Sequence, residues 1–178
     1  MASLPTFKHC KLAVISSYVP RRCGIATFCS DLTRAMTEEL GNHGELYVLA
    51  IDDIPEGYRY PDEVRFQIRS NVQADYRLAA DFILSNQANA LIVQHEYGIF
   101  GGPAGAHILR LLREVPVPVI TTLHTVLAAP TPEQRKVMDE LWRLSDRLVV
   151  MSQRAIDMLR EIYGVPAERI AYIPHGIP

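Results

Sequence analysis

The chain has 178 residues, of which 48% are hydrophobic and 21% charged, and its formal net charge is −2. Such a chain can bury an ordinary hydrophobic core, and its composition argues against disorder. The balanced charge argues against nucleic acid as a main partner, because nucleic-acid-binding domains carry a basic surface. No apolar run approaches the roughly 20 residues of a membrane span, and the first ten residues lack the apolar stretch of a secretory signal. We therefore expect a soluble, cytoplasmic protein.

Strands and helices alternate along the sequence. Apolar runs predict strands at 11–16, 45–51, 64–69, 90–94, 117–123, 147–151 and 169–173. Between them, apolar residues at helical spacing predict helices at 24–40, 72–85, 104–113, 130–145 and 152–163. The strand at 64–69 alternates apolar and polar residues, which places it nearer an edge. This alternation predicts one α/β, Rossmann-like domain with a mostly parallel, doubly wound sheet.

Polar residues collect directly after the predicted strands, where open parallel sheets bind their ligands. Together they supply cations, carboxylates, imidazoles and hydroxyls, a set that suits a hydroxyl-rich or phosphorylated ligand. They are Ser16, Ser17, Arg21, Arg22, Gly24, Asp52, Asp53, Arg69, Ser70, Asn71, Gln94, His95, Glu96, His124, Thr125 and Ser152.

Gly24 opens the first predicted helix. Exposed backbone N–H groups and the helix dipole favour an anion at this position, and glycine permits close approach. The alternative is that Gly24 only relieves a tight turn. The sequence has neither GxGxxG nor GxxxxGK[ST], which argues against a dinucleotide cofactor and against a P-loop enzyme.

Glu96 and His124 are the candidate catalytic residues. The Glu96 carboxylate can orient a sugar hydroxyl or act as a general base; alternatively, it pairs with a neighbouring cation. The His124 imidazole can donate to a phosphate or a sugar hydroxyl; alternatively, it belongs to a satisfied polar cluster. For His95 we favour a structural role. The paired glycines Gly101 and Gly102 indicate a loop that is mobile or closely approached.

Neither the histidines nor the cysteines have the spacing of a metal site, so no metal is expected. His9, His43 and His107 are isolated, and Cys10, Cys23 and Cys29 are interpreted as free thiols. For Cys23 an activated thiolate is a further hypothesis, because two arginines precede it.

Two surface hypotheses concern other partners. Trp142 could serve as a sugar-stacking platform, but its place on a predicted helix favours partial burial. A peripheral contact with anionic lipid is the second hypothesis, and it requires the basic residues to share a surface. Those residues are Arg21, Arg22, Arg65, Arg69 and Arg77.

Four segments together resemble the N-terminal half of a retaining GT-B glycosyltransferase of family 4. They are VPRRCGIA at 19–26, QHEYGIFGG at 94–102, TLHT at 122–125 and IPHGIP at 173–178. In that family two Rossmann-like domains face each other, the N-terminal one holding the acceptor and the C-terminal one the nucleotide-sugar donor. The resemblance implies an N-terminal domain at 1–173 and the start of an interdomain hinge at 174–178, with the donor-binding domain as a missing partner.

The resemblance also assigns roles within the site. It implies that Gly24 lies near the donor diphosphate and that His124 lies beside the transferred sugar. Transfer in this family retains the anomeric configuration and usually needs no metal, so no cofactor is expected beyond the nucleotide-sugar co-substrate. The sequence departs from the family pattern in one respect: it lacks the donor-binding half, which includes the family's paired-glutamate motif.

The expected function is therefore the acceptor-binding half of a hexosyltransferase that acts on a saccharide or polyol. We expect His124 and Glu96 to be catalytic and the isolated chain to be inactive. The expected acceptor-binding residues are Arg21, Arg22, Arg69, Asn71 and Tyr97. Two alternatives remain: half of a GT-B nucleotide-sugar epimerase, and a non-catalytic module that binds a small ligand or a partner.

Overall fold

The strands of the chain form one seven-stranded sheet in the computed structural model, which describes residues 9–176. The order across the sheet is β3-β2-β1-β4-β5-β6-β7, and every described pair is parallel. The predicted fold class is confirmed, with a sheet that is parallel throughout. The strands are β1 (Cys10–Ser16), β2 (Gly44–Asp52), β3 (Val64–Arg69), β4 (Ala90–His95), β5 (Val119–Leu123), β6 (Arg147–Val150) and β7 (Ile170–Tyr172).

The helices lie close to their predicted positions. They are α1 (Gly24–Leu40), α2 (Gln73–Ser85), α3 (Ile108–Glu114), α4 (Pro132–Leu144) and α5 (Gln153–Glu161). Side chains cap three of their N-termini, and the cap of α4 is a reciprocal capping box between Thr131 and Gln134. The helix predicted at 104–113 is confirmed from residue 108, but the prediction was wrong for its first turn, 104–107. Here Gly102, Ala104 and Gly105 have φ values of 79°, 52° and 77°, so a short 3-10 turn precedes α3.

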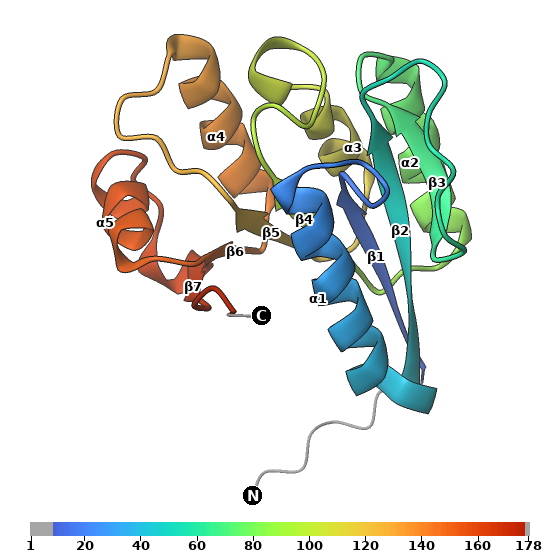
Figure 1. The fold of residues 1–178 in the computed structure, drawn as a ribbon. Coiled ribbons are helices and arrows are strands. Elements are labelled where there is room, and N and C mark those ends of the chain that lie inside the picture. The colour runs from blue at the N-terminus through green and yellow to red at the C-terminus, as the bar shows by residue number, and fades with distance from the viewer. Residues whose placement is uncertain (1–8, 177–178) are drawn as a thin grey trace, which may run out of the picture.

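The direction of the chain across the sheet reverses between β1 and β4. From β1 the chain moves outward to β2 and β3, and from β4 it moves the other way to β7. Right-handed crossovers then place α1 on one face and α2, α3, α4 and α5 on the other. Figure 1 shows α1 in front of the central strands. Ligands of doubly wound sheets bind at such a switch point, beyond the carboxyl ends of the strands.

The hydrophobic core is divided between the two faces of the sheet. The larger cluster joins buried side chains of α2, α3, α4 and α5 to the sheet, and the smaller one joins Cys29 of α1 to Val14, Val48 and Ile92. Across β5, β6 and β7, three apolar residues on the same face of the sheet as this smaller cluster are only partly buried and belong to neither cluster. They are Ile120, Val149 and Ala171.

Candidate functional site

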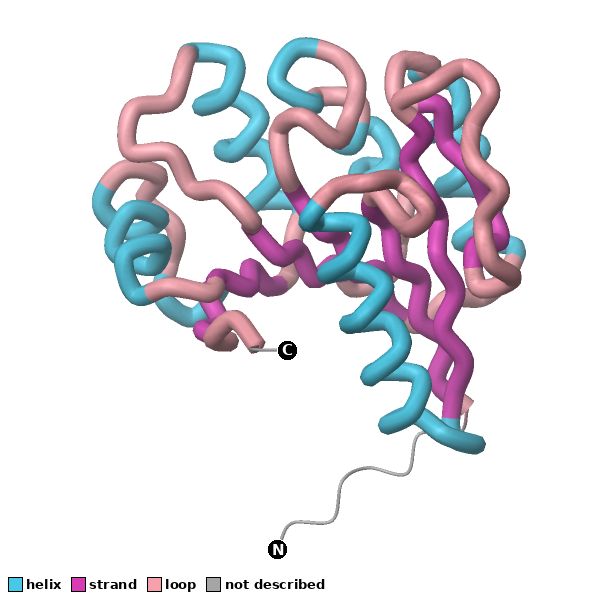
Figure 2. Tube along the Cα trace, in the orientation of Figure 1, coloured by secondary structure: helices cyan, strands magenta, loops and turns pink. Residues whose placement is uncertain are grey.

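Three strand ends and the final segment of the described chain meet beside the first half of α1. His124, directly after β5, donates its backbone N–H to the carbonyl of His95 at the end of β4 (N···O 3.0 Å). The Phe28 ring on α1 lies 5.0 Å from the His124 ring and 5.4 Å from the His175 ring. The segment after β7 turns toward α1, and the loops after β1, β4 and β5 lie at one edge of the sheet (Figure 2). The fold thus brings together predicted site residues that are far apart in the sequence.

The His124 imidazole is half-buried and held on two sides. Its Nε2 lies 2.9 Å from Oε1 of Gln94, and its ring meets Phe28 edge-on, with an interplanar angle of 87°. Burial is the largest influence on its pKa and lowers it, because a charged imidazole would lose hydration. The nearby Glu96 carboxylate acts in the opposite direction, and His175 lowers the pKa further.

Glu96 is held by hydrogen bonds at the rim of the site. Its Oε1 accepts from the backbone N–H of Tyr97 at 2.9 Å, and its Oε2 accepts from the hydroxyl of Thr125. Among residues 9–176 it forms no ion pair, so the cation partner that we considered for Glu96 is not found. The carboxylate is only partly buried and therefore remains open to a ligand.

Two neighbours of Glu96 lie in the core. His95 is fully buried against Phe100, whose ring is nearly parallel at 5.9 Å, and burial lowers the pKa of His95 to about 3. Tyr97 meets the His95 ring edge-on and is only 9% exposed. Most of its side chain packs in the larger core cluster, and its acceptor-binding role stays a prediction.

The arginines of the β1–α1 loop have different surroundings. Arg21 forms an ion pair with Asp53 (Nε···Oδ2 3.2 Å), and Asp53 also accepts a hydrogen bond from Tyr58. Arg22 is exposed and forms no ion pair within the described chain. Arg22 is therefore the available cation beside Gly24, whereas Arg21 ties the loop to the end of β2.

Gly24 begins α1 in open space. A Cβ at this position would meet no atom within 4 Å, and the backbone does not adopt a left-handed conformation, so the fold does not need glycine for a tight turn. Cys23 caps the helix: its Sγ accepts from the backbone N–H of Ala26 at 3.3 Å and lies 3.3 Å from Oγ of Ser17. The N–H groups of Gly24 and Ile25 precede the first intrahelical partner and remain available to a ligand.

The corner between β3 and α2 is packed against the loop after β4. Arg69, which we expected to bind the acceptor, is paired with Asp75, whereas Asn71 is exposed. A Cβ on Gly101 would overlap the backbone carbonyl of Ser70. The paired glycines are therefore needed for close approach, and they bring this loop beside Asn71.

The other predicted residues have structural surroundings. Trp142 is partly buried against the larger core cluster, as predicted, and the three cysteines are free thiols. No group of three or more metal-ligating side chains gathers within the described residues. Along residues 9–176, no helix combines the length and apolar character that crossing a bilayer requires.

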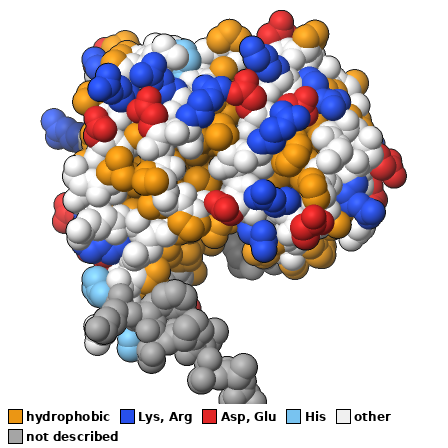
Figure 3. All heavy atoms as spheres, turned by 180° about the vertical axis from the view of Figure 1, so that it is seen from behind, with side chains coloured by type: hydrophobic (Ala, Val, Ile, Leu, Met, Phe, Trp, Pro, Cys, Tyr) orange, Lys and Arg blue, Asp and Glu red, His pale blue; other side chains and the backbone are white. Residues whose placement is uncertain are grey.

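The predicted basic surface is largely neutralised. Arg21, Arg65 and Arg69 each pair with a carboxylate, and Arg65 does so with Glu45. On the face shown in Figure 3, cationic and acidic side chains are interspersed. Positive charge is therefore not clustered on this face as a site for anionic lipid requires, and the lipid contact stays a prediction.

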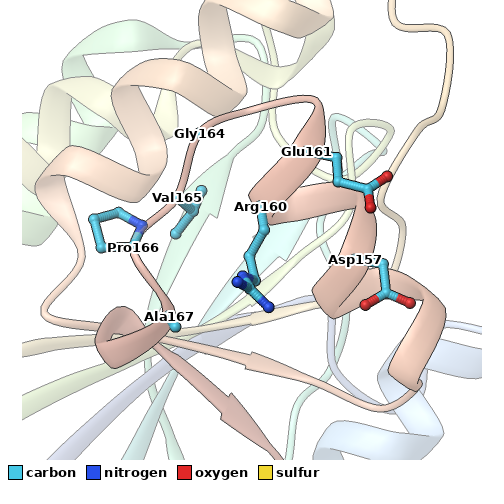
Figure 4. A pocket seen from close by; sticks show the side chains of 7 residues that line it. All are labelled: Asp157, Arg160, Glu161, Gly164, Val165, Pro166 and Ala167. Atoms are coloured by element: carbon cyan, nitrogen blue, oxygen red, sulfur yellow. The ribbon is translucent and has the colours of Figure 1, made fainter.

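Two hollows in the described part of the chain lie away from His124. A pocket of about 450 Å³ lies at the end of α5 and the loop before β7, where Arg160 lies among Asp157, Glu161 and Val165 (Figure 4). Because α5 runs antiparallel to the strands, this pocket lies at the edge of the sheet opposite to the carboxyl ends of the strands. A second pocket of about 330 Å³ includes Asp52 at the end of β2 and Asp75 at the start of α2.

Comparison with known proteins identifies the family. The family model described as Glycosyltransferase Family 4 matches residues 23–178. The crystal structure of a glycosyltransferase from Rickettsia africae ESF-5 superposes with a TM-score of 0.63 at 14% identity, over 96% of this chain and 44% of that chain. The chain thus spans less than half the length of that protein. No curated protein matches the sequence.

A second solved structure is less similar. It is the Bordetella bronchiseptica enzyme WbmH in complex with NAD+, with a TM-score of 0.44 and 13% identity over 80% of this chain and 55% of that chain. The family match covers most of the sequence. It includes residues 23–26 of the first segment noted above and all of the other three segments. The chain belongs to glycosyltransferase family 4.

Proposed function

We propose that this chain is the acceptor-binding half of a retaining glycosyltransferase, which transfers a hexose from a nucleotide sugar to a saccharide or polyol. The observation that carries the proposal is that His124 lies near Glu96 and against Phe28, in the half of α1 that begins at the open Gly24, at the switch point of the sheet. This arrangement offers a carboxylate and an imidazole to hydroxyls, and backbone N–H groups to an anion.

The contacts narrow the roles proposed for individual residues. Gly24 and Arg22 are free to face a donor diphosphate, and cations with helix N-termini stabilise such a leaving group without a metal. Glu96 and Asn71 are open to an acceptor hydroxyl. Arg21 acts by holding the loop through Asp53 rather than by direct contact.

A second, donor-binding domain belongs to the proposal. Tyr172 and Ile173 are 52% and 56% exposed, which supports a partner surface next to the site. Residues 174–176 are exposed and lack regular secondary structure, as the proposed hinge requires, whereas 177–178 lie outside the described residues. The proposed location is cytoplasmic, where nucleotide sugars serve as donors.

Ligand titration of the chain by amide NMR tests the binding function. Neutral saccharides and UDP- or GDP-hexoses should shift resonances at 17–25, 94–97 and 124–125, and leave those at 157–167 unchanged. Glu96→Gln should weaken saccharide binding, and Glu161→Gln, in the remote pocket, is the matched control. Uniform or absent shifts would contradict the proposed site.

A transfer assay tests the need for a second half. The chain alone should transfer no sugar, and addition of a family 4 donor-binding domain should permit transfer with retained anomeric configuration. Turnover by the chain alone would refute the half-site proposal. Release or isomerisation of the sugar without an acceptor would instead indicate an epimerase.

A further inference from the structure

We propose that Gln94 is a positioning residue that holds His124 in the Nε2–H tautomer, so that Nδ1 accepts a hydrogen bond from a sugar hydroxyl. The hydroxyl as ligand rests on the proposed function, whereas the tautomer follows from contacts within the chain. Nothing in the sequence pattern distinguishes Gln94 from the other polar residues at strand ends. Only the contact with His124 singles it out.

Gln94 is held in place by the sheet and by burial. Its backbone is fixed in β4, where it is in register with Thr122 of β5, and its side chain is fully buried. Burial removes the rotamer freedom of a long side chain, so the carboxamide is held at a defined point. Its Nε2 has no hydrogen-bond partner among residues 9–176. Its oxygen lies 2.9 Å from Nε2 of His124.

The contact with Gln94 decides which ring nitrogen of His124 carries the proton. A carboxamide oxygen only accepts hydrogen bonds, so the ring nitrogen that faces it must donate. Nε2 of His124 therefore carries the hydrogen, and in the neutral ring Nδ1 carries a lone pair. Within residues 9–176, Nδ1 of His124 forms no hydrogen bond.

The surroundings of His124 also influence the charge of its ring. Because Gln94 is neutral, it orients the imidazole without stabilising the imidazolium, as a carboxylate in its place would. The nearby carboxylate of Glu96, which accepts from Thr125 and from the backbone N–H of Tyr97, raises the pKa of His124. Burial is the larger influence and lowers that pKa, and His175 lowers it further.

The ligand class follows from the free nitrogen. A lone pair accepts from a hydroxyl, which is a donor, but gains nothing from a phosphate oxygen that carries no hydrogen. Of the two ligands considered for His124, the arrangement therefore selects the sugar hydroxyl. A phosphate would instead be bound at the N-terminus of α1.

The test is imidazole ¹⁵N NMR of the unliganded chain near pH 7.5. The expected result is an Nε2–H tautomer at His124, with a ring N–H that exchanges slowly with water. His107 is an internal reference, because its Nδ1 lies 3.2 Å from the carbonyl oxygen of Ser70 and must donate to it, which requires the opposite tautomer. An Nδ1–H tautomer or an imidazolium at His124 would overturn the proposal.

Two variants separate positioning from packing. Gln94→Leu removes the acceptor and should abolish exchange protection of the His124 ring N–H while leaving His107 unchanged. Gln94→Glu keeps the shape and adds charge, so the pKa of His124 should rise by about one unit or more. An unchanged His124 spectrum in folded Gln94→Leu would refute the role of Gln94.

Saccharide titration of the same sample examines the ligand. A hexose that binds through the proposed atom should shift the Nδ1 resonance of His124 and leave its tautomer unchanged. If the tautomer is as expected but no saccharide shifts Nδ1, the positioning role stands, and both the hydroxyl ligand and its place in the proposed function are refuted.

Discussion

Arg69 at the end of β3 donates two hydrogen bonds to Asp75 at the start of α2, from Nε to Oδ2 at 2.7 Å and from Nη2 to Oδ1 at 2.8 Å. Oδ2 also accepts from the backbone N–H of Arg69 at 3.1 Å. The side chain of Asp75 is 8% exposed and that of Arg69 is 60% exposed. The pair therefore closes the corner between strand and helix, and this use of Arg69 leaves less of it for an acceptor.

Replacing Asp75 tests this structural role. Asp75→Asn should lower the free energy of unfolding at pH 7 by about 1–2 kcal/mol. This is less than the usual contribution of charge-assisted hydrogen bonds, because solvent screens the exposed Arg69 side chain. Hydrogen bonds from Arg69 hold the pKa of Asp75 below its ordinary value, so this contribution is lost as the pH falls and the carboxylate is protonated. Urea denaturation of both proteins at pH 7 and pH 3 measures the difference, which should shrink at pH 3.

An exposed pair provides the control for that prediction. Asp31 and Arg34 form an ion pair on α1 with both side chains more than half exposed. Asp31→Asn should change stability by less than about 0.5 kcal/mol. Equal losses in the two variants would contradict the special role of Asp75.

Gly101 should tolerate no side chain. A Cβ in Gly101→Ala would overlap the carbonyl of Ser70, which is backbone and cannot move aside freely, so we expect a loss of about 1–3 kcal/mol or more. Gly98 lies in the same loop, is exposed and has open space around it, so Gly98→Ala should be nearly neutral. Thermal unfolding of both variants checks this, and equal melting temperatures would refute the close approach.

Gly24 offers a substitution that separates ligand binding from folding. Gly24→Ala should leave stability within about 0.5 kcal/mol, because its Cβ meets open space. A ligand diphosphate that approaches the backbone would meet that Cβ, so we expect nucleotide-sugar affinity to fall by about tenfold or more. Calorimetric titration, with Glu38→Ala at the far end of α1 as control, measures this. Unchanged affinity in Gly24→Ala would contradict the proposed approach.

His95 should make stability depend on pH. The unfolded chain takes up a proton at this residue near pH 6.5, whereas burial lowers the pKa of the folded state to about 3. Between these values, acidification favours the unfolded chain by at most about 1.4 kcal/mol per pH unit. His95→Leu should remove that contribution, so its stability should fall less than that of the wild type between pH 7 and pH 5. Urea denaturation at each pH measures the stability of both proteins. If the two lose the same stability between pH 7 and pH 5, His95 is not a buried, uncharged residue of the folded state.

Local sequence patterns alone determined the positions of most strands and helices in this protein. The apolar run at 45–51 and the helical spacing at 24–40 predicted β2 and α1, because burial periodicity is a property of neighbouring residues. The same reasoning identified β3 at an edge of the sheet and Gly24 at a helix N-terminus. These features need no knowledge of distant contacts.

The tertiary structure decided which polar groups meet. Gln94 and His124 are 30 residues apart, and only the register of β4 with β5 brings them together. The break in the predicted helix at 104–113 accompanies the packing of Gly101 against Ser70, a contact that helical propensity does not encode. Side-chain pattern is short-range information, whereas hydrogen-bond partners and burial depend on where the folded sheet places each strand end.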